Sequence, residues 1–188
     1  MLTAVIFAGG RSRRMGTDKA RLQVGGQPLL TRTVALADAA GLPVLVVGRV
    51  RPDPWPYGAV PFLPDIQPGH GPLGGLHTAL SAGYAPMLAL ACDLPRLTSE
   101  AVQWLTEQFL AERVGEHGMI VVNSGRREPL FSCYAPACLP LVEERLAAGR
   151  LSLHGLIDAG DFGAVDAPDW LIPQLLNINT PEDLKELF

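Results

Sequence analysis

The chain opens on a short apolar run that passes directly into a basic glycine loop, Leu2-Thr3-Ala4-Val5-Ile6-Phe7-Ala8-Gly9-Gly10-Arg11-Ser12-Arg13-Arg14-Met15-Gly16-Thr17-Asp18-Lys19. Residues 2–7 are continuously apolar, as strands buried on both faces of a parallel sheet are. Since open α/β sheets bind ligands at the carboxyl ends of their strands, this junction is the first candidate for a binding site.

Strand and helix signals alternate along most of the sequence. Apolar runs predict strands at residues 2–7, 43–47, 60–63, 87–92 and 119–122. Helical patterns occupy residues 28–40, 73–82 and 99–111, with Thr98 as the expected N-cap of the last. This alternation predicts an α/β fold with a Rossmann-like, mainly parallel sheet flanked by helices. Residues 129–134 and 165–176 are expected to add an antiparallel edge.

Length and composition describe an ordinary globular chain. Its 188 residues suit a single domain, residues 1–188, and it is 48% hydrophobic and 18% charged. No apolar run approaches the ~20 residues of a membrane span, and residues 1–10 lack the basic leader of a signal peptide. The odd set Cys92, Cys133 and Cys138 contains no CxxC pair, which indicates reduced thiols. We expect a cytoplasmic protein that binds no membrane.

Charge is distributed unevenly along the chain. The net charge of -4 argues against a nucleic-acid partner. Residues 1–32 nevertheless hold six cations against Asp18 alone, a local charge of +5 that leaves -9 for the rest. Such a loop either binds a compact anion, such as a polyphosphate, or is a solvated basic surface.

The first loop has the residue types of a phosphate site. Gly9 and Gly10 allow a tight turn that presents bare backbone N–H groups, and the arginines and Lys19 add full positive charge. It is not a Walker A loop, because Gly16 is followed by Thr17 rather than lysine. The alternative is a tight basic turn without a ligand.

Asp93 follows the apolar run at residues 87–92 and is the candidate metal ligand. A carboxylate at a strand end can hold Mg²⁺ and leave the other coordination positions to phosphate and water. The alternative is ordinary turn chemistry, since Asp93 stands two residues before Pro95.

Residues 69–74 match the dinucleotide pattern GxGxxG. That pattern should join the first strand to the first helix, whereas here residues 64–68 separate it from a later strand. A glycine-rich helix entrance that approaches a base or phosphate is the better interpretation.

Asn177 and Asn179 are two of only three asparagines and would share a face if their segment is extended. The residues that follow them read as a capped terminal helix that begins near Thr180. We assign no nucleophile, because phosphoryl-type transfer depends on positioning and charge stabilisation.

The sequence resembles the molybdenum cofactor guanylyltransferase (MobA-like) family over nearly the whole chain. The resemblance rests on the first loop and on four later motifs in the family's order, Gly71-Pro72-Leu73-Gly74-Gly75-Leu76 after Asp65, Ala91-Cys92-Asp93-Leu94-Pro95, Glu128-Pro129-Leu130-Phe131 and Asn177-Ile178-Asn179-Thr180-Pro181. Phe7 replaces the usual leucine, and Gly48-Arg49 replaces a segment in which an asparagine often helps to bind the nucleotide.

The resemblance implies a set of site residues. Nucleotide binding would fall to Phe7, Ala8, Gly9, Gly10, Lys19, Asp65, Gly74 and Asp93. Lys19, Asp93 and Arg14 would be catalytic, with Asp93 as the Mg²⁺ ligand, and Asn177 and Asn179 would bind the acceptor.

The resemblance also implies an enzyme of molybdenum cofactor biosynthesis with the nucleotidyltransferase fold. It would transfer GMP from GTP to the terminal phosphate of molybdenum-molybdopterin, with Mg²⁺ as cofactor and pyrophosphate as the second product. Transient contacts with proteins that make or accept the cofactor are expected. The alternatives are a relative that uses CTP or a sugar or alcohol phosphate, and a nucleotide-binding regulatory module without turnover.

Overall fold

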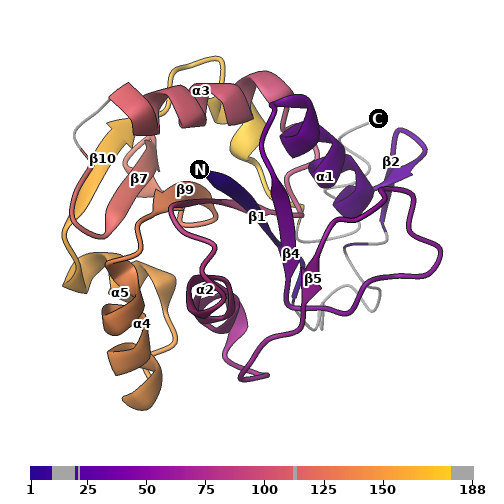
Figure 1. Ribbon diagram of the computed structural model, residues 1–188. Helices are drawn as coiled ribbons and strands as arrows, with labels where there is room; N and C mark the ends of the chain where they lie inside the picture. Colours follow the sequence, from indigo (N-terminus) through magenta and orange to yellow (C-terminus); the bar gives the residue numbers. More distant parts are fainter. Residues whose placement is uncertain (10–19, 21, 112–113, 179–188) are drawn as a thin grey trace.

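Helices cover both faces of a central sheet in the computed structural model, which describes residues 1–9, 20, 22–111 and 114–178 (Figure 1). The five-stranded part has the order β5-β4-β1-β6-β9. Its strands are β1 (Thr3–Phe7), β4 (Val44–Val47), β5 (Phe62–Leu63), β6 (Met87–Ala91) and β9 (Phe131–Tyr134). The first four are mutually parallel, with Ile6 opposite Val46 on one side and Leu90 on the other. The predicted α/β fold is thereby confirmed.

The strand order reverses beside β1. The chain moves outward from β1 to β4 and β5, then crosses back to place β6 on the other side of β1. Such a reversal opens a crevice at the carboxyl ends of the two diverging strands.

A second group of strands extends the sheet beyond β9. It contains β7 (Gly118–Asn123), β8 (Arg126–Arg127) and β10 (Phe162–Asp166), in the order β10-β7-β8. The Ala135 N–H donates to the His117 carbonyl oxygen at 3.0 Å, which joins the end of β9 to the start of β7. An isolated ribbon, β2 (Gln23–Val24) with β3 (Gln27–Pro28), precedes the first helix.

The expected antiparallel edge is half right. In the segment 129–134, β9 pairs antiparallel with β6 as predicted. In the segment 165–176 the expectation is wrong, because β10 pairs parallel with β7 and a 3-10 helix, η2 (Ile172–Leu175), follows it. Two helices between β9 and β10 carry the chain back, which is the crossover that a parallel neighbour requires.

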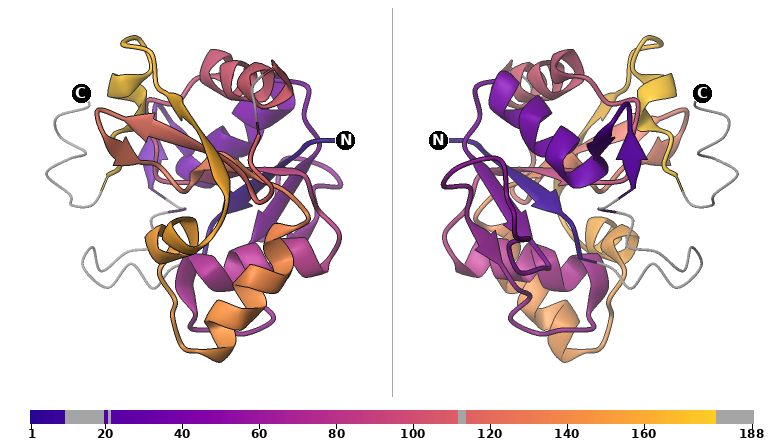
Figure 2. Two further views of the ribbon diagram at one scale, coloured as in Figure 1. Left: turned by 90° about the vertical axis from the view of Figure 1, so that its left-hand side faces the viewer. Right: turned by 90° about the vertical axis from the view of Figure 1, so that its right-hand side faces the viewer.

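Five α-helices complete the layers. They are α1 (Leu29–Ala39), α2 (Gly71–Ser81), α3 (Ser99–Ala111), α4 (Cys138–Ala147) and α5 (Leu153–Ala159). Figures 1 and 2 show α1 and α3 on one face of the sheet, and α2, α4 and α5 on the other. The sequence analysis predicts α1, α2 and α3 but not α4 or α5.

The core divides between the two faces of β1. Ala4 and Ile6 belong to a cluster with buried residues of α1 and α3, while Val5 and Phe7 pack with α2, α4 and α5. All four are less than 10% exposed. Since side chains alternate across a strand, a strand covered on both faces must be largely apolar, as residues 2–7 are apart from Thr3.

Thr98 caps α3 as the sequence predicts. Its Oγ1 accepts from the Ala101 N–H at 3.3 Å, which satisfies one of the free donors of the first turn. Gln174 in η2 adds a second tie, because its Oε1 accepts from both the N–H and the hydroxyl of Thr98 at 3.0 and 2.9 Å.

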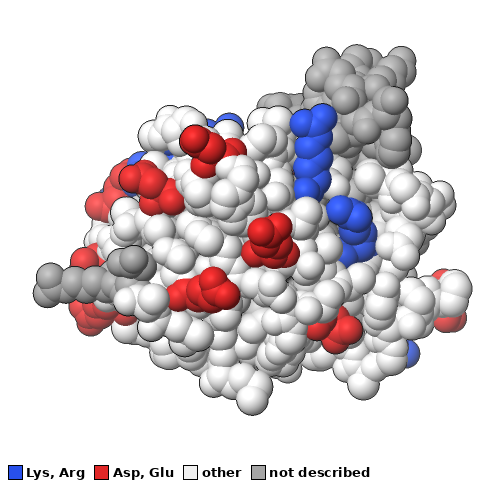
Figure 3. Space-filling view, turned by 90° about the horizontal axis from the view of Figure 1, so that it is seen from above, with Lys and Arg blue, Asp and Glu red and all other residues white. Residues whose placement is uncertain are grey.

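Acidic side chains are scattered over one face of the molecule (Figure 3). The face seen from above in Figure 3 holds scattered acidic side chains and few basic ones. None of the helices in the described part of the chain is both long and apolar enough to cross a membrane.

Candidate functional site

A cleft of about 260 Å³ lies at the carboxyl ends of β1 and β6, where the strand order reverses. It brings together residues far apart in the sequence. Its walls come from the ends of three parallel strands, the loop after β5 and the start of α2, with Phe7, Ala8, Gly9, Val47, Gly48, Asp65, Gly71, Pro72, Gly75, Ala91, Cys92 and Asp93 among the lining residues.

The floor of the cleft depends on two glycines that touch. Gly48 has φ +88°, and an added Cβ would lie 2.5 Å from the Cα of Gly9. A Cβ on Gly9 would in turn lie 3.0 Å from the Cα of Gly48. A side chain at position 48 would therefore push the loops after β1 and β4 apart.

The N-terminus of α2 forms the opposite wall. Gly75 lets this helix approach the sheet, since a Cβ there would lie 3.1 Å from the Phe7 ring. Helix N-termini carry free N–H groups and a partial positive charge, which suit phosphate. Gly71 and Pro72 line the cleft.

Gly74 also lies in the first turn of α2, but it is not among the residues that line the cleft. A Cβ on it would lie 3.1 Å from the Cβ of His70 and 3.3 Å from the Gln67 oxygen. Its predicted contact with the nucleotide stays a prediction.

Asp65 contributes a carboxylate that the described part of the chain leaves unsatisfied. Its loop is fixed to α2, because the Ile66 N–H donates to Thr78 Oγ1 at 3.0 Å and that hydroxyl donates to the Gly74 oxygen at 2.9 Å. Asp65 Oδ1 is buried without a hydrogen-bond partner among the described residues. Burial raises the pKa of this carboxyl above its ordinary value. A ligand N–H or O–H would satisfy the oxygen.

Asp93 is the second residue after β6 and borders two cavities. Its carbonyl oxygen accepts from the Ile178 N–H at 3.1 Å, which ties the strand end to the segment that carries Asn177. The following loop is held by Arg32 of α1, whose Nε and Nη2 donate to the Pro95 and Leu97 oxygens at 3.2 and 3.0 Å. One cation of the basic N-terminal segment thus supports the loop.

The donor set suits a hard divalent cation that a substrate helps to bind. Within the described ranges, no three His, Cys, Asp or Glu side chains form a group that could hold a metal ion. Mg²⁺ commonly binds through one or two carboxylates, waters and substrate phosphates, so the carboxylate of Asp93 fits that role.

A second cavity, of about 370 Å³, begins where the first ends. Pro72, Asp93 and Leu130 line both. Asn177 lies in the second cavity and not in the first, which separates it from the predicted nucleotide residues other than Asp93. Residues of β8, the loop after it and the start of α5 complete this cavity, with Arg126, Glu128, Ser152 and His154 among them.

Four predicted site residues lie outside the described residues, namely Gly10, Arg14, Lys19 and Asn179. Phe7, Ala8, Gly9, Asp65 and Asp93 meet in the first cleft.

Sequence reasoning missed Gly48, Gly75, Arg126 and Glu128 as parts of the two cavities. Gly48 was detectable, because a glycine directly after an apolar strand marks a close backbone approach. The motif Glu128-Pro129-Leu130-Phe131 belongs to the family resemblance, but its sequence indicated no function for Glu128.

Neither of the deeper cysteines is a reactive thiolate. Burial raises the pKa of Cys138 to about 12 and raises the pKa of Cys133 as well. All three cysteines are free and buried.

Known proteins with similar sequences identify the family of this chain. A family model described as MobA-like NTP transferase domain matches residues 4–160. A protein from Pelotomaculum thermopropionicum named "Probable molybdenum cofactor guanylyltransferase" is 32% identical, over 97% of this chain and 89% of its own. One of the same name from Synechococcus elongatus is 36% identical, over 98% and 96%.

A solved structure supports the fold. It is the crystal structure of molybdopterin-guanine dinucleotide biosynthesis protein A from Archaeoglobus fulgidus, at a TM-score of 0.78 and 22% identity. The match covers 100% of this chain and 96% of that one.

Proposed function

Since the chain belongs to the MobA-like NTP transferase family and is therefore a nucleotidyltransferase, we propose that it transfers GMP from GTP to the terminal phosphate of molybdenum-molybdopterin. The observation that carries this proposal is the position of Asp93 between two adjoining cavities. A reaction that joins two phosphorylated molecules needs two sites that meet at the reacting phosphates.

The first cleft suits the nucleotide. Backbone N–H groups at Gly9 and at the start of α2 would face the phosphates, with Lys19 and Arg14 as further predicted contacts. Asp65 would accept from donors of the nucleoside. A carboxylate can pair with the N–H donors of guanine, and cytosine or adenine would leave such a buried acceptor less satisfied.

The second cavity suits the acceptor, with Asn177 and the predicted residue Asn179 as its contacts. An oxygen of the acceptor's terminal phosphate attacks the α-phosphorus of GTP in line and forms the new P–O bond. The bond from that phosphorus to the β-phosphate oxygen breaks, and pyrophosphate leaves.

Asp93 would hold Mg²⁺, which neutralises charge on the reacting phosphates when it is bound. The chain's own task would be positioning, since Asp93 borders both cavities and Arg32 holds the loop that follows it. A cytoplasmic location, where GTP is available, is part of the proposal.

The test is competition between nucleotides. The protein, Mg²⁺ and molybdopterin are incubated with equimolar GTP and CTP, and both pyrophosphate and the dinucleotide product are measured. We expect pyrophosphate only with acceptor present, and a guanine dinucleotide. A cytosine dinucleotide would assign the chain to a cytidylyl branch. If pyrophosphate is released only when a sugar or alcohol phosphate is supplied instead of molybdopterin, the proposed acceptor is wrong.

Asp93→Asn should lower turnover by about 100-fold or more while the melting temperature changes little, because the substitution removes a charge but preserves the side-chain shape. Asp38→Asn on the exposed face of α1 removes the same charge far from the cleft and serves as the control. A near-normal rate with unchanged Mg²⁺ dependence in Asp93→Asn would exclude this residue as the metal ligand.

A further inference from the structure

Two adjacent arginines on β8 face different partners. Arg126 pairs across the hairpin with Asn123, and Arg127 pairs with Val122. Arg126, Arg127 and Glu128 all line the second cavity, but the two arginines have different partners. Arg127 Nη1 lies 2.6 Å from Asp158 Oδ1 of α5, so its guanidinium is bound to a helix.

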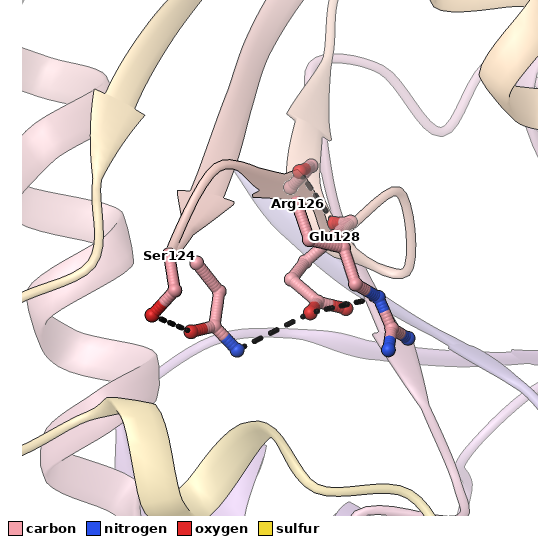
Figure 4. Close-up of polar contacts among 5 residues, drawn as sticks. Ser124, Arg126 and Glu128 are labelled. Atoms are coloured by element: carbon pink, nitrogen blue, oxygen red, sulfur yellow. Dashed lines mark hydrogen bonds and ion pairs between the residues drawn. The ribbon is translucent and has the colours of Figure 1, made fainter.

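Arg126 is held instead through Nε, the nitrogen that joins the guanidinium to the rest of its side chain. Its Nε lies 3.5 Å from Glu128 Oε1, and the same oxygen accepts from Asn123 Nδ2 at 3.3 Å. Asn123 Oδ1 accepts from the Ser124 hydroxyl at 3.3 Å, which fixes the direction of the amide (Figure 4). Glu128 is only 8% exposed, so the carboxylate that anchors Arg126 is itself held firmly.

The hairpin turn makes this arrangement compact. Ser124 and Gly125 have φ values of 50° and 81°, which are the two left-handed positions of a tight two-residue turn. The turn brings Asn123 opposite Arg126 at the edge of the second cavity.

The ends of the Arg126 side chain are available for a ligand. Its side chain is 68% exposed, and within the described part of the chain its Nη1 and Nη2 have no hydrogen bond or ion pair. A guanidinium anchored through Nε presents both terminal nitrogens as a fork, the geometry that matches two oxygens of a phosphate.

We propose that Arg126 binds a phosphate monoester of the acceptor in the second cavity, and that Glu128 and Asn123 are positioning residues that aim it. This assignment rests on the proposed function, in which the acceptor carries a terminal phosphate.

The experiment compares binding of molybdopterin with binding of molybdopterin from which a phosphatase has removed the phosphate. Arg126→Gln should weaken the phosphorylated ligand by about 10- to 100-fold and leave the dephosphorylated one nearly unchanged. Arg126→Lys should restore little, because an ammonium lacks the fork. Glu128→Gln should cause a smaller loss of affinity than Arg126→Gln, and this loss should be larger for the phosphorylated ligand than for the dephosphorylated one.

Arg127→Gln is the matched control, since Arg127 lines the same cavity but its Nη1 contacts Asp158, so the variant removes an identical charge without removing a free fork. It should cost stability through the lost contact with Asp158 but keep the parent's preference for the phosphorylated ligand. Equal losses in the two variants, or a loss in Arg126→Gln that ignores the phosphate, would overturn the proposal.

A parent protein that does not bind molybdopterin would refute the proposed acceptor, and inorganic phosphate then tests the site itself by calorimetry. Phosphate binding that disappears in Arg126→Gln and persists in Arg127→Gln would support the site for another phosphorylated acceptor. Equal binding by both variants would refute it.

Discussion

Asp65 exposes a conflict between stability and binding at the level of one residue. Its buried oxygen lacks a partner among the described residues, and desolvation raises the pKa of the carboxyl. A group whose folded pKa is raised stabilises the fold below its unfolded pKa, and that contribution is lost as pH rises through the folded value. Above that range, burial of the carboxyl therefore costs stability that a bound nucleotide would recover.

Asp65→Asn should raise the melting temperature of the unliganded protein at pH 7, because it removes the cost of the buried charge. The gain should vanish below pH 3.8, the ordinary value, where the parent carboxyl is neutral too. GTP affinity should fall by about 10- to 100-fold. Melting curves across pH and a GTP titration check both parts, and a pH-independent gain would contradict the assigned cause.

Gly48→Ala should destabilise the protein by about 2–4 kcal/mol, because it combines a positive φ with a clash against Gly9. Gly41→Ala is the control for backbone strain alone, since Gly41 has φ +76° and a Cβ there meets nothing within 4 Å. Urea unfolding of both variants gives the difference. Equal losses would mean that the two loops do not need their close contact.

At the scale of elements, α1 supports the site as well as the core. Arg32 makes two hydrogen bonds to backbone oxygens of the loop after β6, and this loop follows Asp93. The contact links a helix on one face of the sheet to the carboxyl edge where the two cavities meet.

Arg32→Met should lower the free energy of unfolding by about 1–3 kcal/mol, because it leaves the Pro95 and Leu97 oxygens without their charged donor. Arg51→Met, at an exposed position, should change it by less than about 0.5 kcal/mol. Urea unfolding measures both. If Arg32→Met keeps the parent's stability, water replaces the guanidinium and the contact holds nothing in place.

At the scale of the whole molecule, one sheet joins the two apolar clusters. Leu171 and Leu175 near the end of the described chain pack into the cluster that contains Ala4 and Ile6 of β1. The strand group β10-β7-β8 continues from β9, which itself pairs with β6. We therefore propose that residues 1–188 form one cooperative domain.

Calorimetry should show a single transition with equal calorimetric and van 't Hoff enthalpies, since the strands of one sheet contribute to both apolar clusters. At about 0.7 kcal/mol per residue near 60 °C, the enthalpy should be roughly 130 kcal/mol. GTP with Mg²⁺ should move the whole transition upward. Two transitions, with only one responding to GTP, would divide the chain into separate units.

The sequence by itself determined the fold class and the position of the first site. Apolar runs and helical periods are local patterns, so they predict β1, β4, β6 and α3 to within a residue or two. Because parallel strands end at one edge, the loops after Phe7 and Cys92 could be expected to meet before any contact was known.

The sequence did not predict α4 and α5, because each carries a residue that disfavours helix. Pro140 stands in the first turn of α4, where proline is tolerated, and Gly155 lies inside α5. The Arg145 side chain occupies the space that a Cβ on Gly155 would fill. The glycine therefore weakens the local helix signal, and a Cβ there would crowd only the flexible end of the Arg145 side chain.

Only the tertiary structure decided what joins across the sheet. Gly9 contacts Gly48, which is 39 residues away in the sequence. β10 pairs with β7, from which two helices and two strands separate it in the sequence. The second cavity is shared by Arg126 and Asn177, which are 51 residues apart. No local pattern encodes such contacts, because their free energy appears only when distant residues pack together. The sequence therefore determined the residues with the chemistry, and the fold decided which of them act together.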